Sequence, residues 1–420
     1  TWGRNSALGR LEKGPNASEL LASSVRQAKA SFAAGDRTSF DEVVELTEKA
    51  GTKFLVPKSA GYEAQLDIHS GMLASGAVSL HDGNMPLRML GSGSSRLMVA
   101  GVQNAGLTKS ITLVDELELG LEPHRIMRLL RFLRDGFPQE ADEHPAVRQT
   151  FLTTHSPVVV CELKVDELFC VRSKDGDVAV NSAKQAEGNA DTAQRHVRSN
   201  PHAFLAPRLL IGEGRTEVGF WRGLDDCWCA ADKESFAFQG VVAVDGGGND
   251  NALKFGLHMQ KLGYQCFLLL DTDVEVSEAD KQAFTEAGGV VSEWPEKCDI
   301  ERRVFLDAPW GTIQELVRLA CEEPGEGRVL SNMRLVEPQL PSFDRAALDA
   351  LEDTVENRQR LASASTLKVP LNAGGKEDRS WFKDMARGER LGKIVFDCLE
   401  GLENKPLADT INKVRQWVDA

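Results

Sequence analysis

Residues 209–291 carry the pattern that most restricts the fold: short apolar runs alternate with helical segments, and glycine or an acidic residue closes the first three runs. Strands are expected at residues 209–211, 241–244, 267–270 and 289–291, with a helix at 251–262. Strands and helices that alternate over such short connections form parallel βαβ units. The sequence therefore predicts an α/β fold with a mostly parallel, Rossmann-like sheet, whose reactive groups belong at the carboxyl ends of its strands.

Four carboxylates stand at these strand ends. Glu213 follows the first run, and Glu217 lies one helical turn further on, where both can face one point. Asp271 and Asp273 follow the third run, and alternate residues of an extended chain share a face. Like charges this close repel each other unless a cation neutralises them. Complementing a helix dipole would explain Glu217 but not Glu213, so the pattern predicts a divalent-cation site.

A second set of motifs lies between residues 91 and 157. A Gly/Ser turn opens a helix, and the backbone N–H groups of such a turn can bind an anion. An apolar strand at 111–114 then ends in two acids, which can hold Mg²⁺ and polarise a water. Another apolar run, at 150–152, precedes a histidine. The candidate nucleotide-site residues are Ser92, Gly93, Ser94, Asp115, Glu116 and His155.

This order of motifs resembles the ABC-type ATPases of the SMC/RecF/OLD kind, whose Walker B motif runs DExE-x-x-L-x-P. The matching residues here are Asp115, Glu116, Glu118, Leu121 and Pro123. The resemblance implies that Asp115 supports Mg²⁺ and that Glu116 is the base for hydrolysis. A homodimer is implied as well, because such ATPases trap ATP between two subunits.

The remaining nucleotide contacts also rest on the resemblance. His155 would sense the γ-phosphate, and Ser92, Gly93 and Ser94 would contact the ATP of a partner subunit, although the GSGSS sequence departs from the usual SGG. No GxxxxGK[ST] phosphate-binding loop occurs in the 420 residues. We therefore expect that loop to precede Thr1 and ATP to bind only to the complete protein.

The carboxylates at the strand ends, in the order EGxTE followed by DxD, resemble those of the Toprim domain of topoisomerases, primases and OLD nucleases. ABC-type motifs followed by Toprim motifs resemble the OLD (overcoming lysogenization defect) family. Membership implies a DNA endonuclease or nickase that uses two Mg²⁺ or Mn²⁺ ions, with Ca²⁺ as an inactive substitute. Glu213, Glu217, Asp271 and Asp273 would be metal ligands or bases. Some relatives are encoded beside a helicase and act in phage defence.

A second metal ion needs further carboxylates. Asp299 and Glu301, at the start of a helix after the fourth strand, are the favoured candidates, and Asp245 is another. Both favoured acids could instead be ordinary first-turn residues of that helix. The family also uses a basic residue near its C-terminus to neutralise negative charge that develops in the transition state. Lys383, between aromatic and acidic neighbours, is our choice over Lys376, although it could also be an ordinary surface lysine.

The domain organisation that these motifs suggest has three parts. Residues 1–203 would be the C-terminal part of an ABC-type ATPase domain with a polar linker at 182–202, residues 204–310 the Toprim core, and residues 311–420 a helical region. Eight scattered cysteines and the lack of a membrane-length apolar run fit a cytoplasmic protein without a membrane segment. The net charge of −14 argues against indiscriminate adhesion to nucleic acid, but metal ions could still meet phosphates.

Two other interpretations stay open at this stage. One is a different Toprim chemistry: a topoisomerase would need a nucleophilic tyrosine, and the chain has only Tyr62 and Tyr264. A primase would usually carry a zinc module, which the cysteine spacing does not show. The other is an SMC/RecF-like DNA-binding ATPase with a Toprim domain that has lost catalysis.

Overall fold

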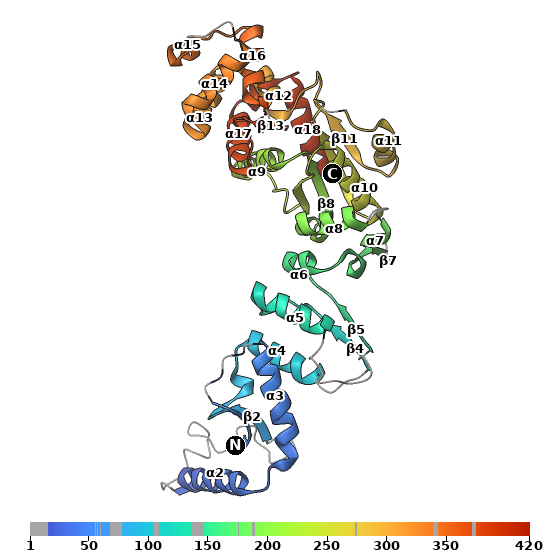
Figure 1. Cartoon of the computed structure of the whole chain (residues 1–420), viewed down its shortest axis with the longest axis vertical. Helices are drawn as coiled ribbons and strands as arrows, with labels where there is room; N and C mark the ends of the chain where they lie inside the picture. Colours follow the sequence, from blue (N-terminus) through green and yellow to red (C-terminus); the bar gives the residue numbers. More distant parts are fainter. Residues whose placement is uncertain are drawn as a thin grey trace. The chain divides into compact units, whose positions relative to one another are not determined.

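The computed structural model describes residues 16–54, 56, 58, 60–67, 78–104, 109–135, 147–174, 176–186, 190–273, 275–338, 343–371 and 375–420 (Figure 1). The chain divides into two compact units, Thr1–Glu162 and Leu163–Ala420. Both contain helices and parallel strands, which confirms the expected α/β class. The boundaries expected after residues 203 and 310 stay predictions.

The first unit combines a parallel pair of strands with helices. Strands β4 and β5 pair in parallel, with Val114 opposite Leu152, so both strands end at the same edge. The apolar face of α5 buries Ile126, Leu129 and Leu130. The elements of this unit are α2 (Asn16–Ala34), η1 (Thr38–Phe40), α3 (Asp41–Phe54), β1 (Tyr62–Leu66), β2 (Val78–Asp82), β3 (Met85–Pro86), η3 (Leu87–Met89), α4 (Ser92–Asn104), β4 (Lys109–Val114), α5 (Pro123–Asp135), β5 (Val147–Leu152) and α6 (Pro157–Glu162).

The second unit begins with a pair of antiparallel strands and four short helical segments. The expectation of a linker at residues 182–202 is wrong. Ala193, His196 and Val197 share one face of a helix at three- and four-residue spacing, and that face is buried. The elements are η4 (Val165–Glu167), β6 (Phe169–Lys174), β7 (Asp177–Ser182), α7 (Ala183–Ala186), α8 (Ala190–Ser199) and η5 (Pro201–Leu205).

A four-stranded parallel sheet forms the centre of this unit, with strand order β11-β10-β8-β9. Strands β8 and β10 are the inner pair, and their residues are almost entirely buried, as expected for strands covered on both faces. The elements from the first strand to the last are β8 (Arg208–Gly212), α9 (Arg215–Ala230), β9 (Val241–Asp245), α10 (Asn249–Lys261), β10 (Gln265–Leu270), α11 (Glu278–Glu286) and β11 (Val290–Glu293).

The remainder of the second unit is mainly helical, as the sequence predicts. Its elements are α12 (Ile300–Asp307), α13 (Trp310–Ala320), the π-helical turn η6 (Cys321–Gly325), α14 (Glu326–Val336), α15 (Arg345–Asp349), α16 (Val355–Ser365), β12 (Lys368–Pro370), β13 (Lys376–Asp378), α17 (Met385–Asp397), η7 (Leu399–Leu402) and α18 (Pro406–Asp419). Within the described ranges, no helix has both the length and the apolar composition to cross a membrane.

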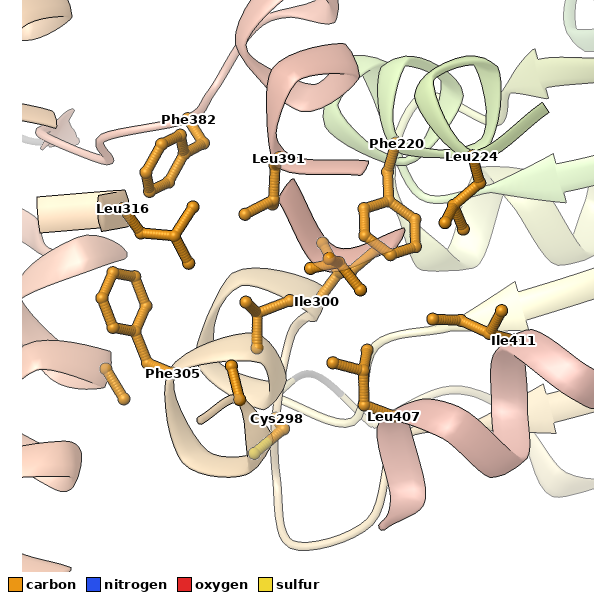
Figure 2. Packing of buried hydrophobic residues seen from close by; sticks show 14 of the residues in the cluster. Phe220, Leu224, Cys298, Ile300, Phe305, Leu316, Phe382, Leu391, Leu407 and Ile411 are labelled. Atoms are coloured by element: carbon orange, nitrogen blue, oxygen red, sulfur yellow. The ribbon is translucent and has the colours of Figure 1, made fainter. Parts of the chain in front are cut away.

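One hydrophobic core joins the sheet to these C-terminal helices. Figure 2 shows Ile300 and Phe305 of α12 among side chains from α9, α13, α17 and α18. Phe220 on α9, Leu391 on α17 and Ile411 on α18 are fully buried in the same cluster. The helical region is therefore part of the structure that supports the sheet.

Candidate metal centre and nucleotide-site motifs

The inner strands of the parallel sheet bring three of the expected carboxylates together. Glu213 directly follows β8, and Asp271 and Asp273 directly follow β10, its hydrogen-bonded neighbour. One carboxylate oxygen from each of the three residues lies within 4.8 Å of the other two. The carboxyl ends of two adjacent parallel strands thus form a single acidic site.

Two oxygen atoms of this site are suited to a cation. Glu213 Oε2 and Asp271 Oδ1 are buried and have no hydrogen-bond partner among the described residues. Burial raises the pKa of Asp271 well above its ordinary value, and the charges of Glu217 and Glu213 raise it further. A buried carboxylate without a partner is costly unless it is protonated or neutralised. Since Mg²⁺ and Mn²⁺ prefer carboxylate oxygens, the donor set fits such an ion.

Three more acids extend the site inward, and all three are buried. Burial raises the pKa of Glu217 to about 7, and Glu213 contributes to the rise. Burial likewise raises the pKa of Glu301 to about 8, with Asp299 and Glu217 as further causes. Burial also raises the pKa of Asp299. The acids expected to hold a second metal ion are thus close enough to one another and to Glu213 and Asp273 for their charges to interact.

Two of these acids also have local structural roles. Asp299 Oδ1 accepts a hydrogen bond from the Arg302 N–H at 2.8 Å and so caps α12. Glu217 Oε2 accepts one from the Gly214 N–H at 2.7 Å. The helix-start interpretation is therefore correct for Asp299 as far as one oxygen is concerned. Each carboxylate keeps a second oxygen that these bonds do not use.

Lys383 is exposed, as the surface-lysine alternative expects, yet the acids of the site act on its charge. Partial desolvation lowers the pKa of its amine, but the charges of Glu301, Glu217 and Asp378 outweigh this effect and raise the pKa above its ordinary value. The amine is thus held in its charged form. Lys376 lies instead on the β12–β13 hairpin, where it is exposed opposite Pro370. Asp245 accepts a bond from the Gly247 N–H and lies 3.8 Å from Arg215. Its backbone pairs with Gly212, the residue before Glu213.

Glycines allow the strand ends to approach each other. A Cβ at Gly212 would lie 2.5 Å from the Glu217 Cβ, so only glycine lets the helix turn back over the strand. Gly248 has φ +100°, and its N–H donates to the Glu213 carbonyl at 2.8 Å. The glycine-rich turn at residues 246–248 therefore supports the Glu213 loop.

Glycines also fix Lys383 relative to Glu217. Helices α9 and α17 contact through their backbones at four positions: a Cβ would lie 2.1–2.4 Å from a carbonyl oxygen of the other helix at each of Gly219, Gly223, Gly388 and Gly392. The Thr216 hydroxyl donates to the Phe382 carbonyl at 3.2 Å. Since Glu217 and Lys383 directly follow these two residues, the helix pair holds both at one place.

Two site residues were not anticipated from the sequence. The Asn249 side chain donates to the Asp271 carbonyl at 2.7 Å and accepts from the Asp271 N–H at 3.1 Å, which fixes the start of the DxD loop. Its position just after three glycines was the available signal. Lys368 Nζ lies 3.8 Å from Asp273 Oδ2. No pattern in the sequence connects Lys368 with Asp273, because only the tertiary fold brings them together.

In the first unit, Thr153 joins the two candidate nucleotide-site acids. Its hydroxyl donates to Asp115 Oδ1 at 2.6 Å and accepts from the Glu116 N–H at 2.9 Å. Glu116 has φ +45°, an unusual backbone conformation for a residue with a side chain. Glu118 accepts hydrogen bonds from the Thr154 hydroxyl and the His155 N–H. The DExE motif and the His155 loop thus form one connected turn.

The Gly/Ser turn contacts this same loop. A Cβ at Gly93 would lie 2.4 Å from the Gly120 carbonyl, so the start of α4 packs closely on the DExE loop. Arg96 donates to the carbonyls of Asp115 and Leu119. Ser94 Oγ accepts from Arg125, whereas Ser92 is exposed. The structure therefore brings all six candidate residues onto one small region of the first unit.

Comparison with known families bears on this first unit. A family described as "AAA domain, putative AbiEii toxin, Type IV TA system" matches residues 4–161. The first unit is similar to an AAA-type ATPase domain. Such a domain uses ATP and Mg²⁺, in agreement with the expected ATPase motifs. No curated protein matches the chain.

Proposed function

We propose that this chain is an ATP-regulated, divalent-metal-dependent DNA nuclease of the OLD type, in which a Toprim domain carries out phosphodiester hydrolysis. The observation that supports this most directly is the convergence of Glu213, Asp271 and Asp273 within 4.8 Å, with two buried oxygens that lack partners. Metal-dependent hydrolases of this kind activate water and stabilise the leaving oxygen with such ions.

In this proposal the chain's own groups divide the work. Glu213, Asp271 and Asp273 would hold one ion, and Glu217, Asp299 and Glu301 would hold the second. Divalent ions bound there would supply an activated water and would neutralise charge on the phosphate. Lys383, which stays protonated, would stabilise negative charge on the phosphate as the bond breaks. Asn249 would keep Asp271 in place through both of its backbone hydrogen bonds.

A topoisomerase has less support. Both tyrosines are buried, Tyr62 in the first unit and Tyr264 in the second. The Tyr264 hydroxyl donates to the Phe204 carbonyl, and burial raises its pKa above the ordinary value. A buried tyrosine hydroxyl that is bonded to a backbone carbonyl is not free to attack a phosphate. ATP-dependent regulation and the homodimer belong to the proposal as consequences of the ATPase-type unit.

The test is cleavage of supercoiled plasmid with Mg²⁺ or Mn²⁺, followed on a gel. We expect nicked and linear products with free ends from the wild-type chain, none with EDTA, and none from Asp271→Asn. Asp280→Asn, a half-buried acid on α11, is the matched control and should cut like wild type. Protein-linked ends would indicate a topoisomerase. Unchanged plasmid with the wild type would favour a non-catalytic, SMC-like role and refute the proposal.

A further inference from the structure

A groove of about 1070 Å³ lies beside the acidic site in the second unit. Its lining comes from six elements: α8, η5, α9, the edge strand β9, α10 and the start of α17. The volume is at the top of the ~300–1,000 Å³ range of small-molecule sites. The groove is therefore large enough to hold part of a polymer.

The groove and the acidic site share a wall. Gly246 and Gly247 line the groove, while the Gly246 N–H donates to the Gly212 carbonyl and the Gly248 N–H to the Glu213 carbonyl. The loop that lines the groove is thus hydrogen-bonded to the backbone of Gly212 and Glu213. A chain lying in the groove would pass along the loop that holds the Glu213 backbone in place.

Helix α9 carries arginines on the face toward the groove and a carboxylate on another face. Arg215, Val218 and Arg222 recur at three- and four-residue spacing, so they lie on one helical face, and that face lines the groove. Glu217 is on another face and is buried with the other carboxylates. One helix therefore offers cations to the groove and a carboxylate to the metal site.

Two arginines of the groove are available to a ligand. Arg195 on α8 and Arg222 on α9 are both exposed. Neither has a carboxylate within 4.0 Å in the part of the chain that the structure describes, and Arg222 contacts only the Met385 sulfur. Arginine is well suited to phosphate, which it binds with a planar set of donors.

Three aspartates also line the groove, and each is already engaged. Asp225 accepts from the Phe236 N–H, and burial raises its pKa. Asp384 caps α17 and pairs with Arg387. Asp245 accepts from the Gly247 N–H. The lining thus carries three arginines and three aspartates, and Arg195 and Arg222 are its arginines without a carboxylate partner among the described residues.

We propose that this groove binds the phosphate backbone of a nucleic-acid strand and leads it to the carboxylates, with Arg195 and Arg222 as phosphate contacts. The inference rests on the proposed nuclease function, because it assigns that reaction's substrate path. It adds a binding site that the carboxylates alone do not define. Arg215, 3.8 Å from Asp245, would lie where the nucleic-acid strand passes from the groove to the carboxylates.

The test is equilibrium binding of a fluorescein-labelled single-stranded oligonucleotide in EDTA, measured by anisotropy over a range of salt. We expect Arg195→Ala/Arg222→Ala to weaken binding about 25-fold at 0.1 M salt, because two lost contacts remove about 1.4 from the slope of log K against log salt. The matched control is Arg318→Ala/Arg328→Ala, which removes the same charge from α13 and α14, outside the groove. The control should bind like wild type.

Three results would overturn the groove proposal. They are no binding by wild type, equal losses in both double variants, and displacement of the oligonucleotide by dTMP at equimolar concentration, which would indicate a mononucleotide pocket. Plasmid cleavage by the same proteins separates the two proposals. If wild type binds through the two arginines but never cuts, the nuclease fails and the groove stands. If the arginine variant cuts with unchanged KM, the groove fails and the nuclease stands.

Discussion

The contact between α9 and α17 gives the most quantitative prediction. Gly219→Ala would place a Cβ 2.1 Å from the Met385 carbonyl oxygen and 2.9 Å from the Glu389 nitrogen. Both atoms belong to the backbone of α17, so no side-chain rotation can relieve the overlap. The two helices would have to separate, and the segment that carries Lys383 would move with α17.

Two opposing effects determine the size of the change. Alanine is more favourable than glycine in a helix interior by ~0.8–1.0 kcal/mol. Overpacking a close contact costs ~1–3 kcal/mol, and an overlap with backbone belongs at the upper end. We therefore expect Gly219→Ala to destabilise the second unit by about 1–2 kcal/mol. For a unit of this size that lowers the melting temperature by roughly 2–8 °C.

The assay is thermal unfolding of the whole chain, with plasmid cleavage measured below the transition. Gly327→Ala on α14 is the control, because a Cβ there meets no atom within 4 Å. Its melting temperature should stay the same or rise slightly. We also expect Gly219→Ala to lose cleavage, since Lys383 no longer faces the carboxylates. A melting temperature for Gly219→Ala equal to or above that of Gly327→Ala would refute the close helix contact.

Other predictions concern single groups. Asp271→Asn should abolish cleavage yet raise stability in EDTA, because it removes a buried charge whose pKa is raised; a urea midpoint at or below wild type would contradict this. Lys383→Ala should lower kcat by about 10²–10³-fold with little change in KM, and kcat within a few-fold of wild type would exclude a role in catalysis. Burial lowers the pKa of both His196 and His258 to about 4, so the unfolded chain binds more protons once pH falls below about 6.5. The free energy of unfolding therefore falls as the pH drops from 6.5 to 4, and each histidine lowers it by up to about 2 kcal/mol at pH 5. The measurement is the urea midpoint of wild type minus that of His196→Gln/His258→Gln, taken at pH 7.5 and at pH 5.0. The double variant is needed because the buried carboxylates shift stability in the opposite direction as the pH falls. A difference in midpoint that is the same at both pH values would contradict the histidine argument. Glu116→Gln, in a protein that also contains the phosphate-binding loop, should block phosphate release from ATP while cleavage stays measurable.

The sequence predicted the central sheet well because its signals are local. Apolar runs of strand length, the glycines that follow them and the short connections to helices need no distant partner. The same holds for Glu213 and for the DxD pair, since their positions follow from the ends of the strands. The linker interpretation of residues 182–202 failed because the buried face of α8 is short and interrupted by polar residues.

What the sequence by itself determined is the set of acids at the ends of β8 and β10, since strand direction and turn chemistry fix them within a few residues. The family resemblance proposed Asp299, Glu301 and Lys383 as further members, but only the tertiary structure relates their charges to these acids and adds Lys368. Those residues arrive through helix packing, and close backbone contact at glycines such as Gly388 sets where α17 lies. Such contacts depend on the fit between surfaces far apart in the chain, which no local pattern of residues encodes.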